Sequence, residues 1–224
     1  MDNFYAMLVD YESKSCPGKM LGLFSTDMMN PKSESFHSVD MSKEIFQINQ
    51  EKIYLNLWKK RKLNFDYYFE SAHLFSQECW SLLNKYRIAP HISIPVIVAI
   101  SSQSVAEEKA YKLVAFENKQ FFDNRTSVFQ IGEMGTILPS KINFTDMEYD
   151  LFQLNDTILH NILIVSANLM NVLKNANLDG YKFVSLDDLL DTFMNDHNLN
   201  ALSAGIVNSR TPPIFIPTSP SFQP

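Results

Sequence analysis

The chain has 224 residues and a formal net charge of −6, which argues against a nucleic-acid-binding protein because such proteins usually present a basic face. Six glycines are too few to favour a phosphate-binding loop. The longest apolar run, residues 92–100, is far shorter than the roughly 20 residues that a membrane-spanning helix needs. The first residues lack a basic stretch followed by an apolar core, so we expect no signal peptide and a cytoplasmic protein whose two cysteines are free thiols.

The N-terminal part of the chain is predicted to be rich in strands. Residues 4–9 and 20–24 are short apolar runs that we expect to form an antiparallel pair, and residues 27–43 are polar and irregular. Residues 53–58 alternate between apolar and polar side chains, which is typical of a strand. The basic run at 59–62 is either a solvated turn, the interpretation we favour, or a contact for an anion.

The middle of the chain mixes one helix with several strands. Ser76 is expected to open a helix that runs to about Arg87, with Cys79 and Trp80 on its apolar stripe. Strands are expected at 96–100, 111–116 and 127–131, and residues 132–141 are predicted to be a loop because they contain two glycines and Pro139. No internal repeat is visible in the sequence.

The clearest local pattern lies between residues 150 and 194. The branched apolar run 162–165 predicts a buried strand, and Ser166 can cap a helix that continues to about residue 176. Gly180 is placed where a chain that leaves a helix takes a positive φ, and a strand follows at 181–184. Ser185 can then cap a second helix, with Asp188 at the capping-box position.

This pattern, DLFQL followed by ILIVSANL and DGYKF, resembles the C-terminal half of bacterial immunity proteins of the eleven and forty-three type, which neutralise polymorphic toxins. Phe75-Ser76 with Trp80 and Leu83 is similar to the first helix of that family. Pro95-Val96 and residues 111–114 are similar to its central strands. The resemblance covers roughly residues 66–190 and implies an inhibitor of a toxin, without catalysis or a cofactor.

The residues themselves predict no catalytic group and no metal site. The five histidines do not pair with cysteines or carboxylates at ligand spacings, and Cys79 fits a buried small hydrophobe better than a nucleophile. The adjacent carboxylates at 107–108 and 187–188 cannot face each other across a substrate.

Charge is the one asymmetry that suggests a binding surface. Residues 146–200 contain nine acidic residues and only two lysines. The simpler interpretation is a solvated acidic face. The alternative is a patch that attracts a basic partner, and it would consist of Asp179, Asp187, Asp188 and Asp191.

Together these observations predict an α+β fold in which an antiparallel-rich sheet packs with two to four helices. We expect a strand-rich part at 1–65 packed on the rest, an immunity-like part at 66–203 and a Pro-rich extended tail at 204–224. The leading function is a cytoplasmic immunity protein that binds a cognate toxin domain, a basic one if the acidic patch is the contact, and neither nucleic acid nor membrane. The alternatives are an enzyme that reverses a toxin's modification or acts in defence, and a scaffold that recruits a partner through the tail.

Overall fold

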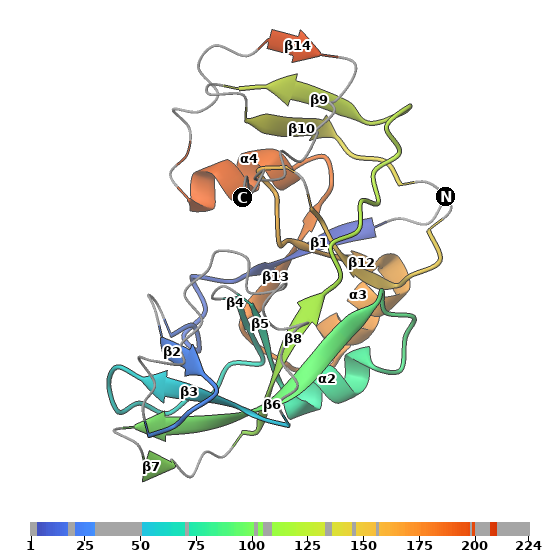
Figure 1. The fold of residues 1–224 in the computed structure, drawn as a ribbon. Coiled ribbons are helices and arrows are strands. Elements are labelled where there is room, and N and C mark those ends of the chain that lie inside the picture. Colours follow the sequence, from blue (N-terminus) through green and yellow to red (C-terminus); the bar gives the residue numbers. More distant parts are fainter. Residues whose placement is uncertain are drawn as a thin grey trace, which may run out of the picture.

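A computed structural model describes residues 4–17, 21–29, 51–69, 72–100, 103–104, 109–132, 136–144, 147–155, 157–197, 199 and 207–209. In these residues the chain forms fourteen strands and three helices (Figure 1). Nearly all strand pairs are antiparallel, as predicted. The three helices agree with the predicted two to four, and the fold is broadly α+β. The strands form three sheets, whereas the sequence suggested a single one.

The four-stranded sheet contains the N-terminal strand at its centre. Its order is β11 (Leu151–Gln153), β12 (Leu163–Ser166), β1 (Phe4–Val9) and β13 (Tyr181–Ser185). The predicted pairing of β1 with the next apolar run is therefore wrong. Four consecutive residues of β1 are buried, and a strand buried in this way is stabilised by partners on both of its edges.

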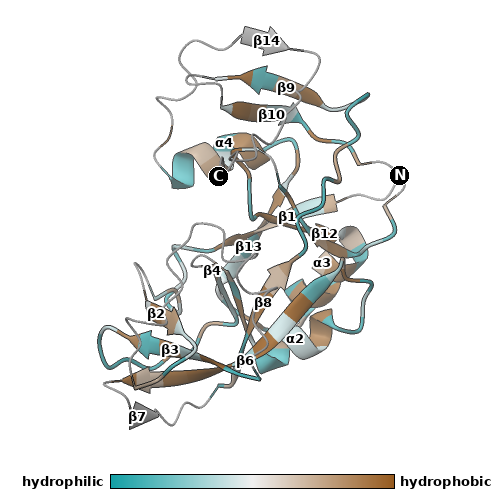
Figure 2. Ribbon diagram, viewed as in Figure 1, coloured by the Kyte–Doolittle hydropathy of each residue, from teal (hydrophilic) through white to brown (hydrophobic). Residues whose placement is uncertain are grey.

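The seven-stranded sheet contains most of the middle of the chain. In order it consists of β2 (Gly22–Ser25), β3 (Ile53–Leu57), β6 (His91–Ile100), β8 (Tyr111–Phe116), β5 (His73–Ser76) and β4 (Tyr67–Phe69), with β7 (Gln103–Ser104) attached to β6. Only β3 and β6 are parallel among its strand pairs. Gly22 of β2 allows close approach to β3, since a Cβ there would collide with the carbonyl oxygen of Asn56. Figure 2 shows hydrophobic and hydrophilic residues alternating along the first half of β6, whereas its second half is hydrophobic.

The three-stranded sheet comprises β10 (Ile137–Lys141), β9 (Val128–Ile131) and β14 (Val207–Ser209). The loop predicted at 132–141 is thus partly a strand. Ile137 and Leu138 are buried, and Pro139 lies where the register with β9 is irregular, a place where sheets tolerate proline. β14 falls within the predicted tail; the rest of the tail, and most of the predicted irregular segment 27–43, lie outside the described residues.

The helices are α2 (Gln77–Leu83), α3 (Ala167–Asn175) and α4 (Leu189–Asp196). The predicted caps Ser76 and Ser166 are confirmed, because each side chain accepts a hydrogen bond from the amide three residues later. α2 ends four residues earlier than predicted. Asp188 rather than Ser185 is the N-cap of α4, and Ser185 instead exchanges hydrogen bonds with Asp188 in the preceding turn.

The structure contains a repeated unit that the sequence does not reveal. We call β4, β5, α2, β6 and β8 the first copy, and β11, β12, α3, β13 and β1 the second copy. In both copies a hairpin leads into a capped helix and then into a further strand. One more strand, β8 in the first copy and β1 in the second, lies in the sheet between the second hairpin strand and the strand that follows the helix. The registers agree throughout. Ser76 pairs with Tyr111 as Ser166 pairs with Phe4, and Phe116 pairs with His91 as Val9 pairs with Tyr181.

In each copy an aspartate just before the hairpin forms hydrogen bonds to the serine that caps the helix. Ser76 donates its hydroxyl to Asp66 Oδ1 at 2.6 Å, and its amide donates to the Asp66 carbonyl at 2.9 Å. Ser166 makes the same two bonds to Asp150, both at 2.9 Å. Apart from this Asp–Ser pair and the buried Leu83 and Leu173 of the two helices, equivalent positions mostly hold different residues such as His73 and Leu163, which explains why the repeat is not visible in the sequence.

Each aspartate also binds the other copy, so the two sheets meet at two edges. The Asp66 amide donates to the Asp179 carbonyl at 2.8 Å, and the Asp179 amide donates to Asp66 Oδ2 at 2.9 Å. Correspondingly, the Asp150 amide donates to the Arg87 carbonyl at 2.6 Å, and the Ala89 amide donates to the Leu151 carbonyl at 2.9 Å. These reciprocal contacts join the two copies around one hydrophobic core.

Candidate partner-binding site

Three of the four predicted contact residues lie together at the start of α4. Asp187, Asp188 and Asp191 are exposed, and within the described parts of the chain none of them is paired with a lysine or arginine. Asp188 and Asp191 also lie near the helix N-terminus, where negative charge is favourable. The structure therefore presents three carboxylates whose fields are not neutralised by a neighbouring cation.

Asp179 lies apart from the other three, because the five residues of β13 separate it from them by roughly 16 Å. Its carboxylate accepts hydrogen bonds from the Ser13 hydroxyl at 2.8 Å and from the Gly180 amide at 2.7 Å. Partial burial opposes ionisation, but hydrogen bonds from Ser15, Ser13 and Gly180, with Lys109 nearby, lower the pKa of Asp179 overall. The Asp179 side chain thus holds the loop after β1 against the start of β13, while its amide and carbonyl join the two copies through Asp66.

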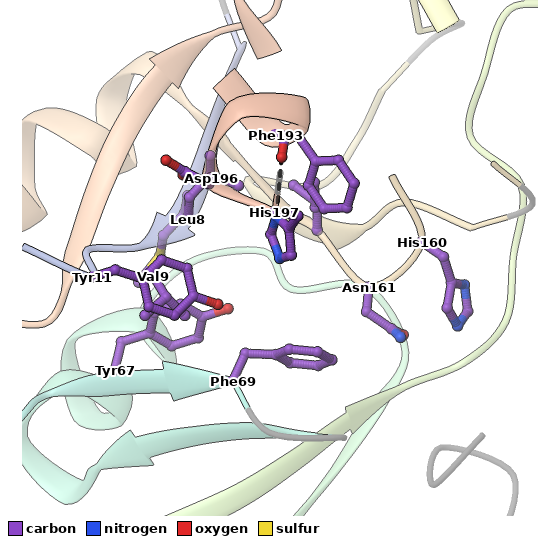
Figure 3. A pocket seen from close by; sticks show the side chains of 12 residues that line it. Leu8, Val9, Tyr11, Tyr67, Phe69, His160, Asn161, Phe193, Asp196 and His197 are labelled. Carbon is purple, nitrogen blue, oxygen red and sulfur yellow. Dashed lines mark hydrogen bonds between the residues drawn. The ribbon is translucent and has the colours of Figure 1, made fainter. Parts of the chain in front are cut away.

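A pocket lies beside the C-terminal half of α4, where the two copies meet (Figure 3). Its volume is about 160 Å³, and β1, β4, the turn before β12 and α4 all contribute to it. Aromatic rings make up much of the wall: those of Tyr11, Tyr67, Phe69, Phe193 and His197. The sequence could not reveal this pocket, because its walls come from segments that are distant along the chain.

The aromatic rings are held by contacts among themselves. Phe193 stacks on His197 with ring centroids 4.3 Å apart, and Tyr11 meets His197 edge-on at 6.2 Å. His197 Nδ1 lies 3.0 Å from the Phe193 carbonyl, to which it donates. Tyr11 is 48% exposed, so the pocket opens to solvent on its side. Burial, and then the nearby Cys16 and Asp196, raise the pKa of Tyr11 and keep its hydroxyl protonated.

Behind the pocket a chain of buried polar side chains crosses from one copy to the other. The Tyr67 hydroxyl lies 3.1 Å from His73 Nδ1, and His73 Nε2 lies 2.8 Å from Gln153 Oε1. Gln153 Nε2 donates to Asn155 Oδ1 at 2.9 Å, so its Oε1 accepts from His73 Nε2–H and His73 Nδ1 accepts from Tyr67. Asn155 Nδ2 then donates to the Lys119 carbonyl at 3.0 Å. Every step has a donor and an acceptor, as buried polar groups require.

Three buried ionisable groups of the first copy, His73, Tyr67 and Cys79, are held in their neutral forms. Burial lowers the pKa of His73 to about 4, despite the opposing hydrogen bond to Gln153. Burial also raises the pKa of Tyr67 and of Cys79, whose thiol is fully enclosed. A buried thiol that stays protonated behaves as a small hydrophobe, as the sequence predicted. The described residues contain no group of three or more His, Cys, Asp or Glu side chains placed to hold a metal ion.

The fold is thus an α+β assembly of two interlocked copies, with an acidic helix start and an aromatic pocket on its surface. The model of one protein family, Immunity protein 43, matches residues 24–201, and the chain belongs to this family. The match begins well before residue 66, so the family domain includes strands that the sequence resemblance did not reach. No curated protein matches the chain. None of the described helices is long and apolar enough to cross a membrane.

Proposed function

We propose that this protein neutralises a toxin domain in the cytoplasm by binding it stoichiometrically, without chemistry of its own. The observation that carries the proposal is the surface on α4 of an Immunity protein 43 family member. One end of the helix presents carboxylates that form no ion pair with the described residues, and the other end lies beside an open aromatic pocket. Aromatic side chains are enriched in protein interfaces, and carboxylates at a rim increase the association rate with a basic partner. The aromatic pocket therefore supports a protein partner, and the carboxylates support a basic one.

The proposal is tested with a charge-swapped protein. Asp187, Asp188 and Asp191 are replaced together by lysine, and binding is measured against the toxin domain that co-purifies with the unmodified chain. We expect slower association and weaker binding. The melting temperature should fall by only a few degrees, because all three side chains are exposed but Asp188 and Asp191 lie at the N-terminus of α4, where a positive charge is unfavourable. A matched control replaces by lysine Glu51, Glu117 and Glu148, which are also exposed and lie outside α4 and the pocket lining.

If the α4 variant binds as tightly as the unmodified protein, the acidic start of α4 is not the contact. If the control variant loses as much affinity, the effect is one of net charge rather than of this surface. Asp179 is tested separately by Asp179→Asn, because its carboxylate accepts hydrogen bonds from the Ser13 hydroxyl and the Gly180 amide and its loss is expected to reduce stability.

A further inference from the structure

We propose that the pocket beside α4 binds an arginine side chain of the toxin, with the guanidinium between the aromatic rings and Asp196. The inference deepens the proposed function and rests on it for the identity of the partner, but not for the chemistry of the pocket. Size, lining and charge each limit the occupant.

Size excludes most small ligands. Pockets for cofactors and drug-sized molecules occupy about 300–1,000 Å³, whereas this one has about 160 Å³. A volume of this order suits one long side chain that enters from a partner's surface.

The lining selects a side chain with an apolar stem and a flat cationic end. Met7, Val9 and Ile162 provide apolar surface for a methylene stem, and the rings of Tyr67, Phe69 and Phe193 provide faces for a cation. A guanidinium is planar, stacks on aromatic rings and pairs with a carboxylate more readily than an ammonium does. This combination favours arginine over an anion or a purely apolar side chain.

The charges around the pocket favour the same occupant. Among the described residues of the lining, Asp196 is the only acidic one. The α4 helix with its preceding turn adds Asp187, Asp188 and Asp191 and contains no lysine or arginine in its sequence. Asp196 is at present paired with Lys182, whose Nζ lies 2.8 Å from Oδ2 and 3.1 Å from Oδ1. An incoming guanidinium must therefore share Asp196 with Lys182, so removing Lys182 is expected to improve binding.

The experiment titrates the full chain with N-acetyl-arginine methylamide and follows the tyrosine and histidine ring signals by NMR. We expect the signals of Tyr11 and His197 to shift with this compound, and not with the citrulline or norleucine analogues at the same concentrations. Asp196→Asn is expected to weaken binding about fivefold, while Lys182→Gln strengthens it. Asp191→Asn is the matched control, since it removes the same charge from α4 outside the pocket, and it should change binding little.

Equal binding of the norleucine analogue would overturn the proposal and make the pocket a site for an apolar side chain. Equal effects of Asp196→Asn and Asp191→Asn would show that only the general field of α4 matters. Tyr11→Leu gives a second check that does not disturb the ion pair, and it should weaken arginine binding by removing a ring from the rim. A toxin that binds the protein tightly while the arginine compound does not bind would refute the pocket's role and leave the proposed function intact.

Discussion

The two copies of the hairpin–helix unit share their hydrogen bonds but differ in how deeply their key aspartates are buried. The side chain of Asp66 is 3% exposed and pairs with Lys109 at 2.9 Å, whereas Asp150 is 15% exposed and pairs with Arg87, whose side chain is 69% exposed. The same motif is therefore enclosed in the first copy and open to water in the second. We expect its energetic contribution to follow burial rather than geometry.

The largest difference is expected from removing the two aspartates. Asp66→Ala leaves the Ser76 hydroxyl and the Asp179 amide without an acceptor, and should destabilise the protein by about 2–4 kcal/mol. Asp150→Ala removes a partly exposed acceptor that water can replace, and should cost about 1–2 kcal/mol. Urea unfolding measures both. Equal losses would contradict the comparison and indicate that burial does not distinguish the copies.

The pH dependence of stability tests a second difference, the histidine that the first copy has in place of Leu163. The pKa of His73 is about 4 in the folded protein and 6.5 when unfolded, so the unfolded chain binds its proton first. The contribution of the buried neutral His73 to the free energy of unfolding is complete above pH 6.5. It is lost as the pH falls towards 4, by about 3 kcal/mol in total.

The matched variant for this test is His73→Leu, which introduces the residue of the second copy. It should be less stable at pH 7, since Tyr67 and Gln153 lose a partner, but its stability should fall less between pH 6.5 and 4. Carboxylates titrate in both proteins, so the difference between the two pH profiles isolates the histidine. Parallel profiles would show that His73 is not buried in its neutral form.

The smallest effect is expected at the exposed ion pair of the second copy. Arg87→Met removes a bond of 3.2 Å to Asp150 and should change the unfolding free energy by less than about 0.5 kcal/mol. The equivalent change in the first copy, Lys109→Met, leaves Asp66 buried without its cation and should cost distinctly more. Similar changes in unfolding free energy for the two variants would show that burial of the aspartate does not determine the strength of the ion pair.

Local signals in the sequence predicted local structure well. Ser76 and Ser166 cap helices because a hydroxyl just before a helix accepts a hydrogen bond from an amide of the first turn. Gly180 has a positive φ, as predicted, with a value of 98°. A Cβ at Gly180 would also lie 2.6 Å from the Tyr67 carbonyl oxygen, a contact with the other copy that no local pattern shows.

Features that depend on distant segments could not be predicted. β1 pairs with strands more than 150 residues away, and the pocket needs Tyr11, Phe69 and Phe193 to meet in space. Asp187, Asp188 and Asp191 are exposed, as expected for a solvated acidic face. Composition could not show that Asp179 lies at the far end of β13, where its amide bonds to Asp66 of the other copy.

The most direct test of the proposed function is a titration of toxin activity against the mole ratio of this protein to the toxin domain that it captures. An inhibitor that occupies the toxin should abolish activity at a fixed ratio near one to one, with a sharp end point at concentrations above the dissociation constant. Protection by trace amounts, with activity lost progressively over time, would contradict the account and identify the protein as an enzyme.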